Sequence, residues 1–533
     1  MTSPRHEALR ALSEETFDLL IIGGGITGMA TAREGAGRGL KVALVEAEDY
    51  ASGTSSRSTK LIHGGIRYLK ERQFRLVRET VAERMALLEG APHLVRPLWF
   101  LFPVYRGDPD PLPLLWLGMW LYDRYAGRKL GTLRHRRLRA GDALQKEPLL
   151  RREGLLGAGL YVDAVTDDGR LTVAVMKDAR RRGAVVVNRA PVVGFLKANG
   201  QIQGAWVEDA LTGEKIPVRA RVVLNAAGPW ADEVRRLDEE GAPPLLLLAK
   251  GIHLAVPYEK LPLRQAVVMR GRDGRIMFAI PRLDFTYAGT TDTPYEGDLR
   301  ALRATGEEVA YVLEAMGRMF PEAKVGFEDV VSTWAGVRPL VRPKVGVPAD
   351  AVSRDYQLFK SSSGLVTVGG GKLTAHQAMA RHIVDDLFPS TRARALKTSA
   401  LPGREPLPTL GDQELWADDY GLPLLWVEKL AWHFGSETPE VLRLLPKEGE
   451  AEVRVAEAVT RFAFSREDAF TVEDVLARRF PMALFSRDQG RGMAETVAKV
   501  LAEERKLFPH DAKELLEGYR RYLQAMEAWR EEV

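Results

Sequence analysis

The chain has 533 residues, too many for one hydrophobic core, so we expect about two to four domains. A formal net charge of +4, from 76 basic and 72 acidic residues, argues against a dedicated nucleic-acid-binding protein and permits weak attraction to an anionic membrane. The absence of cysteine excludes disulfides, thiolate nucleophiles, iron–sulfur clusters and cysteine-ligated zinc, so redox chemistry would need an organic cofactor or a metal held by histidine and carboxylate.

Targeting signals are not visible in the sequence. Residues 1–16 are polar and lack the apolar core of a signal peptide. No apolar run approaches the about 18 residues that a membrane-spanning helix needs. We therefore expect a cytoplasmic protein, and whether it then contacts a membrane is a separate question.

The first predicted element is a dinucleotide-binding crossover. An apolar run within 17–28 leads into Gly23, Gly25 and Gly28, and a second apolar run ends on Glu46. The first glycine allows the tight turn, the second lets backbone approach a pyrophosphate at a helix N-terminus, and the third allows close packing. Glu46 lies where a carboxylate accepts hydrogen bonds from ribose. A glycine-rich turn without function is the alternative, but the whole array favours a bound dinucleotide.

A hydroxyl-rich stretch at 51–60 follows and runs into an apolar segment that contains His63-Gly64-Gly65. Its many N–H and O–H donors suit a loop that wraps an anion. A flexible surface linker is the alternative, although linkers rarely lead directly into such a segment. Apolar residues at helical spacing then predict an amphipathic helix over 74–88.

The middle of the chain predicts alternating helices and strands and then a β-rich part. A helix is expected at 171–182, and a buried strand within 221–230 ends on small residues, as a nearby cofactor requires. Further strands are expected at 184–187, 192–196, 253–256, 266–268, 275–280 and 287–292. The last four predict a mixed or antiparallel sheet that faces the substrate.

The end of the chain repeats the glycine pattern and then becomes helical. Residues 364–374 contain an apolar run that ends on the three glycines 369–371, and a helix is expected from about 374 to 387. Beyond 400 the sequence is helical and charged. The last helix should begin near 511, and its apolar face is formed by Leu515, Tyr519, Tyr522, Met526 and Trp529.

Two interpretations fit the aromatic segment 116–122, which lies beside Arg124, Arg128 and Lys129. Tryptophan and tyrosine flanked by cations are typical of a membrane interface. The same aromatic side chains could instead cap the core of the substrate domain. The sequence favours neither.

Three segments together resemble the FAD-dependent sn-glycerol-3-phosphate dehydrogenases: 17–28 with Glu46, the run 52–69, and 369–374. Further matches occur in the family's order at 91–94, 250–253, 289–292, 336–340 and 353–356. Two departures lie beside these motifs, since Thr27 stands where many relatives carry asparagine and 375–377 differs from the usual triplet.

The resemblance implies a flavoprotein that oxidises sn-glycerol 3-phosphate to dihydroxyacetone phosphate and passes electrons through FAD to a membrane quinone. It implies an α/β fold with a Rossmann-like FAD-binding domain of the glutathione-reductase/D-amino-acid-oxidase type, a mixed-sheet substrate domain and a helical C-terminal domain. The expected limits are 14–95, 155–245 and 345–395 for the first, 96–154 and 246–344 for the second, and 396–533 for the third. Peripheral contact with the inner face of the cell membrane is implied, and a homodimer stays open.

The resemblance also assigns site residues. His253 would be the catalytic base, with Arg338 beside it, and a histidine satisfied by the backbone is the alternative for His253. The expected substrate-binding residues are Arg67, Tyr68, Thr291, Arg338, Arg354 and Lys372. Most arginines are solvated surface charges, but Arg338 stands in an otherwise apolar segment. The expected FAD-binding residues are Gly23, Gly25, Ile26, Thr27, Gly28, Glu46, Ser52, Thr54, Ser55, Ser56, Lys60, Leu61, His63, Gly64, Gly65, Val193, Ala226, Gly228, Gly370, Lys372, Leu373 and Thr374. No metal is expected.

Three other functions compete with this one. The nearest is an oxidase of the same family that uses oxygen and produces hydrogen peroxide. The second is an amine or 2-hydroxyacid oxidase on the same scaffold, which would not need the cations of a phosphate site. The third is a non-catalytic protein that has lost the flavin, which the intact glycine motifs argue against.

Overall fold

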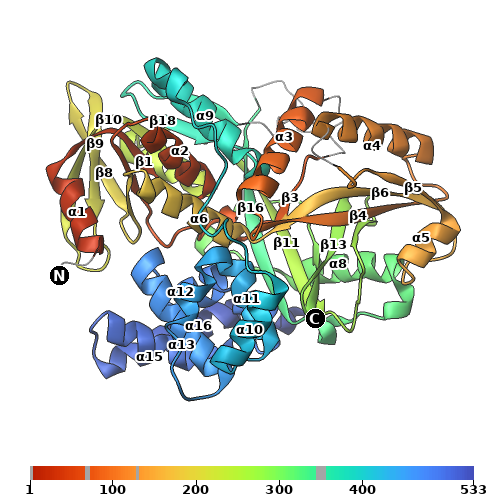
Figure 1. The fold of residues 1–533 in the computed structure, drawn as a ribbon. Coiled ribbons are helices and arrows are strands. Elements are labelled where there is room, and N and C mark those ends of the chain that lie inside the picture. The colour runs from red at the N-terminus through yellow and green to blue at the C-terminus, as the bar shows by residue number, and fades with distance from the viewer. Residues whose placement is uncertain (1–3, 66–72, 128–130, 344–355) are drawn as a thin grey trace.

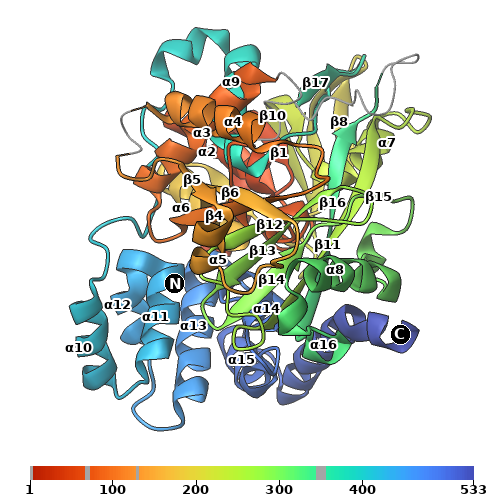
Figure 2. The same ribbon diagram turned by 90° about the vertical axis from the view of Figure 1, so that its right-hand side faces the viewer.

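The structure is a computed structural model and describes residues 4–65, 73–127, 131–343 and 356–533. Figure 1 shows two β-sheets side by side, with a group of helices from the C-terminal part of the chain beneath them. The view in Figure 2 again places these helices below the sheets.

The first sheet is the predicted Rossmann-like unit. Within the described ranges its main path runs β17 (Gln357–Lys360), β18 (Val366–Gly369), β10 (Lys215–Asn225), β1 (Thr16–Ile22), β2 (Val42–Val45) and β7 (Val185–Val187). The strands from β18 to β7 are parallel. Parallel strands need crossovers. The crossover from β1 to β2 is α2 (Ile26–Gly37), which follows the glycine turn as predicted.

Both faces of this sheet are covered. Alternate residues of β1 point to opposite sides, so Leu19 and Ile21 enter one core and Leu20 and Ile22 the other. The first core lies beneath α2, α6 (Asp168–Arg181) and α9 (His376–Leu387). The second lies beneath α1 (Pro4–Glu14) and the strands β8 (Val192–Ala198) and β9 (Gln201–Glu208), which extend the sheet from β10. Helix α7 (Ala231–Asp238) follows β10.

The second sheet is mixed, as predicted. Its described strands are β15 (Thr293–Pro294), β11 (Leu246–Pro257), β14 (Phe285–Gly289), β13 (Ile276–Arg282), β12 (Ala266–Arg270), β4 (Val95–Tyr105), β6 (Leu155–Thr166) and β3 (Leu61–Ile62), with β16 (Ser332–Val341) paired to β11 and β5 (Arg136–Arg139) paired to β6. Strand β12 is parallel to β4, and most other pairs are antiparallel.

Two strands differ from the expected domain limits. Both β3 and β6 lie in this second sheet, whereas the limits 14–95 and 155–245 assigned them to the FAD domain. The reason is long-range pairing, because β6 is paired with β4 along nearly its whole length. A local reading of the sequence does not show such pairing. The domain limits therefore stay a prediction.

Helices cover the second sheet as well. Helices α5 (Ala140–Lys146) and α8 (Gly306–Met319) contribute to a core on one face. Helices α3 (Phe74–Gly90) and α4 (Leu112–Ala126) contribute to another, together with the C-terminal helices. The aromatic, proline-rich stretch 95–125 forms β4 and most of α4. Proline in the first turn is compatible with the start of α4.

The C-terminal part is helical, as predicted. Its helices are α10 (Leu410–Tyr420), α11 (Leu424–Phe434), α12 (Thr438–Leu442), α13 (Ala451–Glu467), α14 (Met482–Phe485), α15 (Arg491–Glu504) and α16 (Pro509–Glu527). Helix α14 places Phe485 against Trp334 and Tyr287 of the second sheet. The predicted apolar face of the last helix is confirmed, since Tyr519, Met526 and Trp529 are buried. Among the described residues, no helix combines the length and apolar content that crossing a bilayer demands.

A buried ionic cluster joins the C-terminal helices to the first sheet. Asp49, which follows β2, contacts Arg478 at 2.6 Å and Arg479 at 2.7 Å. From α6, Arg170 contacts Glu467 at 2.6 Å. All these side chains are almost fully buried. Removing one partner of such a cluster leaves an uncompensated buried charge.

We predict that Asp49→Asn destabilises the fold by about 3–5 kcal/mol, because the buried cluster loses a negative charge that contacts both Arg478 and Arg479. Thermal unfolding followed by circular dichroism measures this as a lower midpoint temperature. The control is Glu14→Gln, which removes one partner of the exposed pair with Arg10 and should leave the midpoint nearly unchanged. Equal midpoints for the two variants would contradict the role of the cluster.

Candidate active site

The hydroxyl-rich loop at 52–60 connects the two sheets. The Oγ of Ser55 accepts a hydrogen bond of 2.9 Å from the backbone N–H of Ile26, at the start of α2. The Oγ1 of Thr54 donates one of 2.7 Å to the carbonyl of Val337 in β16. The loop therefore fixes the glycine turn relative to the strand that carries Arg338.

The end of the loop is held by a buried ion pair. The Nζ of Lys60 lies 2.5 Å from Asp168 and donates to the carbonyl of Ser56 at 3.0 Å. The hydroxyl and N–H of Ser58 donate to the other oxygen of Asp168. Lys60 was predicted to bind FAD, but its side chain is buried and directed at Asp168 at the start of α6. In this structure it acts as an anchor of the loop.

The glycine turn has the geometry that a pyrophosphate requires. Gly23 has φ of +116°, and a Cβ there would lie 2.5 Å from the carbonyl oxygen of Ala226. A Cβ on Gly28 would collide with the carbonyl oxygen of Gly23. The turn delivers the chain to the N-terminus of α2, whose cap residue Gly25 has no side chain. This end of the helix can therefore hold an anion.

Glu46 lies at the end of β2 beside this turn. Its Oε2 accepts a hydrogen bond of 2.5 Å from the N–H of Gly24, and Oε1 accepts one of 2.8 Å from Glu48. Both bonds fix the carboxylate next to the predicted ribose position. The residues present therefore fit a dinucleotide such as FAD.

The two later glycine motifs meet although they are far apart in the sequence. The Oγ1 of Thr374 accepts a hydrogen bond of 3.1 Å from the N–H of His63 and donates one of 3.2 Å to its carbonyl. Gly370 and Gly371 both have positive φ, which allows the turn after β18. The predicted residues at 61–65 and 370–374 therefore lie side by side.

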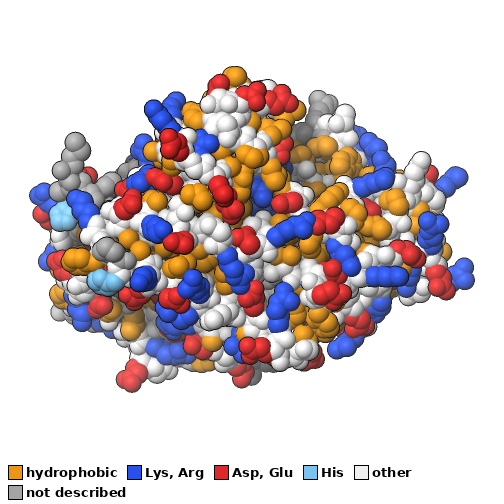
Figure 3. Space-filling model, turned by 90° about the horizontal axis from the view of Figure 1, so that it is seen from below, with side chains coloured by type: hydrophobic (Ala, Val, Ile, Leu, Met, Phe, Trp, Pro, Cys, Tyr) orange, Lys and Arg blue, Asp and Glu red, His pale blue; other side chains and the backbone are white. Residues whose placement is uncertain are grey.

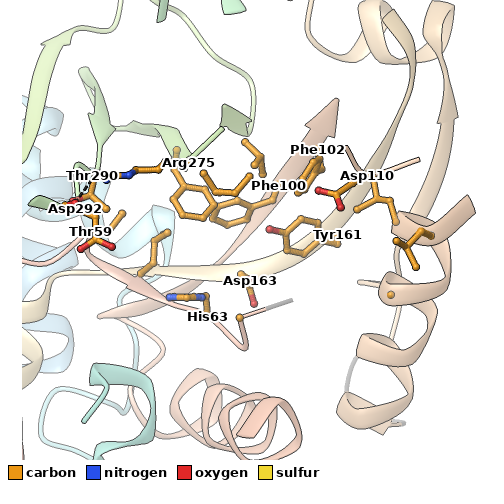
Figure 4. A pocket seen from close by; sticks show the side chains of 18 of the residues that line it. Thr59, His63, Phe100, Phe102, Asp110, Tyr161, Asp163, Arg275, Thr290 and Asp292 are labelled. Atoms are coloured by element: carbon orange, nitrogen blue, oxygen red, sulfur yellow. Dashed lines mark hydrogen bonds between the residues drawn. The ribbon is translucent and has the colours of Figure 1, made fainter. Parts of the chain in front are cut away.

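A cavity of about 560 Å³ opens beside His63 (Figure 4). One end is polar, and its lining includes Thr59, Arg275, Thr290, Thr291, Asp292 and Arg338. The rest is mainly apolar and is lined by side chains such as Phe100, Phe102, Tyr161, Phe278, Leu114, Leu115, Leu117 and Leu121. The cavity therefore joins a charged end to an apolar end that reaches α4.

Arg338 is held in place at the polar end. Its Nη1 lies 3.0 Å from Oδ1 of Asp292, and its Nη2 donates to Oγ1 of Thr290 at 3.0 Å. The Oγ1 of the neighbouring Thr291 accepts from the N–H of Ile252. These bonds fix a guanidinium on the cavity wall.

His253, the predicted base, lies behind the wall. Its side chain is 2% exposed, and its ring stacks on Trp334 with 5.0 Å between centroids. Nε2 lies 2.9 Å from Oγ1 of Thr59, which does line the cavity. Burial, together with the cations of Arg338 and Lys60, holds the pKa of His253 well below its usual range. The imidazole is therefore neutral at physiological pH, as a proton acceptor must be.

Other predicted residues lie in different places. Leu61, Gly65 and Thr291 line the cavity, while Ala226 is buried beside the turn at Gly23. Val193 lies on the outer strand β8 with its side chain 40% exposed. Arg67, Tyr68 and Arg354 lie outside the described residues. Among the described residues, no group of three or more His, Asp or Glu side chains could hold a metal ion.

Sequence reasoning missed Arg275 as a residue of the polar end. Its Nη1 donates to the carbonyl of Asp292 at 2.5 Å. Arg275 and Arg338 therefore contact the same residue and lie near each other. The sequence shows only an arginine at the start of a predicted strand, one of 76 basic residues. The pairing of β13 with β14 brings it to the site.

Comparison with known proteins agrees with these features. The family model described as FAD dependent oxidoreductase matches residues 18–385, and that described as the C-terminal domain of alpha-glycerophosphate oxidase matches 375–511. The chain is 45% identical over 386 residues to the aerobic glycerol-3-phosphate dehydrogenase of Staphylococcus haemolyticus, covering 72% of this chain and 69% of the relative. It is also 45% identical over 381 residues to the enzyme of that name from Bacillus subtilis, covering 72% and 68%.

A solved structure is similar over nearly the whole chain. The glycerol-3-phosphate dehydrogenase of Bacillus halodurans, complexed with FAD, matches with a TM-score of 0.82 and 33% identity, covering 99% of this chain and 98% of the other. The similarity therefore includes both sheets and the C-terminal helices.

The glycine turn generates a prediction about the cofactor. Gly28→Ala should abolish or strongly weaken FAD binding, because its Cβ would force the turn away from α2. Flavin absorbance per protein in the purified variant measures this. The control is Gly317→Ala in α8, where a Cβ meets nothing within 4 Å. Full flavin content in the Gly28 variant would show that the turn does not hold the cofactor.

Proposed function

The chain belongs to the family of FAD-dependent glycerol-3-phosphate dehydrogenases, and from this premise we propose that it oxidises sn-glycerol 3-phosphate to dihydroxyacetone phosphate and passes the electrons to a membrane quinone. The observation that carries this proposal is the cavity with a cationic end beside the flavin motifs and an apolar end beside an exposed apolar helix.

The residues expected to hold FAD are those that fix the glycine turn. The N-terminus of α2 would receive the pyrophosphate, and Glu46 the ribose. The segment that contains His63 would place backbone against the isoalloxazine ring. When bound, FAD supplies the acceptor for the hydride that leaves C2 of the substrate.

The substrate phosphate would bind at the polar end of the cavity. A phosphomonoester is close to a dianion at neutral pH and needs more than one cation. Arg338 and Arg275 both lie at this end, and Asp292 contacts both. The phosphate would replace Asp292 as the acceptor of hydrogen bonds from the guanidinium groups of Arg338 and Arg275. Lys372 is the expected third cation.

Helix α4 supports the quinone and the membrane contact. It lines the apolar part of the cavity with Leu115 and Leu121, and its outer side chains include Leu117, which is 59% exposed, and Trp120. An acceptor that is soluble in lipid could then pass from the membrane to the cavity along an apolar surface. Inner residues such as Met119 are buried, so one side of α4 packs on the core, and the proposal assigns the exposed side to the membrane.

The opposite side of the molecule is less suited to a membrane. The C-terminal helices lie below the sheets, away from α4, in both ribbon views. Figure 3 shows this lower face, on which basic and acidic side chains are interspersed. A face of mixed charge gives little attraction to anionic lipid.

An oxidase that uses oxygen is the second candidate. The match of residues 375–511 to the C-terminal domain of alpha-glycerophosphate oxidase favours it. The two functions differ in their product, since the oxidase makes hydrogen peroxide in stoichiometric amount. The amine-oxidase alternative has no such support, because the relatives at 45% identity are glycerol-3-phosphate dehydrogenases.

We predict that Arg338→Gln raises KM for glycerol 3-phosphate by about 10- to 100-fold, since a charge-assisted hydrogen bond contributes about 1.5–3 kcal/mol. Steady-state kinetics with a soluble dye as acceptor measures the change. Arg318→Gln on the exposed side of α8 is the matched control. A KM equal to that of the control would remove Arg338 from the phosphate site.

We predict that Trp120→Asp lowers turnover with a quinone in vesicles but leaves turnover with a soluble dye unchanged, because it places a charge on the exposed side of α4, away from the cavity lining. Co-sedimentation with anionic vesicles should fall in parallel. The control is Leu410→Asp on α10, which places the same charge at another exposed apolar side chain. If both variants keep quinone turnover and peroxide accompanies each turnover of the wild type, the oxidase is the correct function.

A further inference from the structure

Thr59 separates the buried His253 from the cavity. The cavity is lined by Thr59 and not by His253, whose side chain is 2% exposed. The Oγ1 of Thr59 lies 2.9 Å from Nε2 of His253. On the basis of the proposed function, we propose that the hydroxyl of Thr59 relays the proton of the substrate alcohol to His253.

The backbone of Thr59 is fixed by its neighbours. Its carbonyl accepts a hydrogen bond of 3.0 Å from the hydroxyl of Tyr287. The carbonyl of Ser58 accepts one of 3.1 Å from the indole of Trp334. Lys60 is locked by Asp168. A threonine side chain has few accessible rotamers, so the hydroxyl stays between the cavity and the imidazole.

The ring of His253 is fixed as well. It stacks on Trp334 on one side, and a Cβ on Gly289 would collide with the ring. Among the described residues, Nδ1 has no hydrogen-bond partner, so the contact with Thr59 orients the imidazole. A neutral ring with its hydrogen on Nδ1 presents Nε2 as an acceptor for the threonine hydroxyl.

The charges that face the ring make it respond to the substrate. Arg338 and Lys60 are the cations that disfavour the imidazolium form. Asp168 neutralises Lys60. A phosphate dianion bound at Arg338 would offset the positive charge of that arginine. Binding of the substrate would therefore make His253 a stronger proton acceptor in the complex that reacts.

In the proposed step, each proton and the hydride move to a named acceptor. The O–H bond of the substrate alcohol breaks, and its proton moves to Oγ1 of Thr59. At the same time the hydroxyl proton of Thr59 moves to Nε2 of His253, so Thr59 ends neutral and His253 becomes the imidazolium. The hydrogen on C2 leaves with its electron pair as a hydride to the oxidised flavin, and the carbon–oxygen bond becomes a carbonyl. Two protons move for each hydride transferred.

The test compares three variants by rapid-mixing flavin reduction. Thr59→Val keeps the shape and removes the hydroxyl, so the reduction rate should fall by roughly 10²-fold, a usual contribution of acid–base groups. Thr59→Ser should stay within several-fold of the wild type. The control Thr286→Val removes another buried threonine hydroxyl, one bonded to the carbonyl of Leu261, and should keep the wild-type rate.

Two readouts distinguish a relay from a merely structural role. The concentration of glycerol 3-phosphate that half-saturates reduction should change little in Thr59→Val, because the phosphate contacts remain. Adding Thr59→Val to His253→Ala should slow flavin reduction no further, since each substitution alone already breaks the same proton path. Independent, multiplying effects, or a wild-type rate in Thr59→Val, would overturn the relay.

The wild-type enzyme provides a test that does not depend on a variant's folding or flavin content. In mixtures of light and heavy water, transfer of two protons gives a curved dependence of the reduction rate on deuterium fraction. A linear dependence would overturn the relay. Failure of the wild type to be reduced by glycerol 3-phosphate would instead refute the proposed function, so the two failures are distinguishable.

Discussion

The site depends on the buried ion pair between Lys60 and Asp168. A lysine and an aspartate removed from water are costly unless they meet, so the loop at 52–60 can take few other positions. Thr54 and Ser55 bind this loop to β16 and to the start of α2. One anchored segment thereby sets the distance between the cofactor's glycine turn, the base and the cationic end of the cavity.

Much of the fold follows from local patterns in the sequence. The order of apolar run, glycines and Glu46 predicts the crossover, and the structure has β1, α2 and β2 at those positions. The mixed second sheet and the helical C-terminal part were also predicted. The pairing of β6 with β4, about fifty residues earlier, could not be predicted, because local periodicity does not report such pairing.

The site was predictable only as a set of residue types. Motifs identified Arg338 and His253, yet no spacing shows that Thr59 stands between His253 and the cavity. Lys60 illustrates the same limit, because its position in a cofactor motif suggested a ligand contact and the structure gives it a buried carboxylate. Arg275 reaches the site through strand pairing alone.

The proposed function requires that a flavin and a phosphorylated alcohol meet in this cavity. The most direct test is the absorption spectrum of the purified protein before and after anaerobic addition of glycerol 3-phosphate. We expect a flavin spectrum that bleaches with glycerol 3-phosphate and stays unchanged with glycerol or an amino acid. A colourless protein that takes up no FAD, or a flavin that glycerol 3-phosphate leaves oxidised, would contradict it.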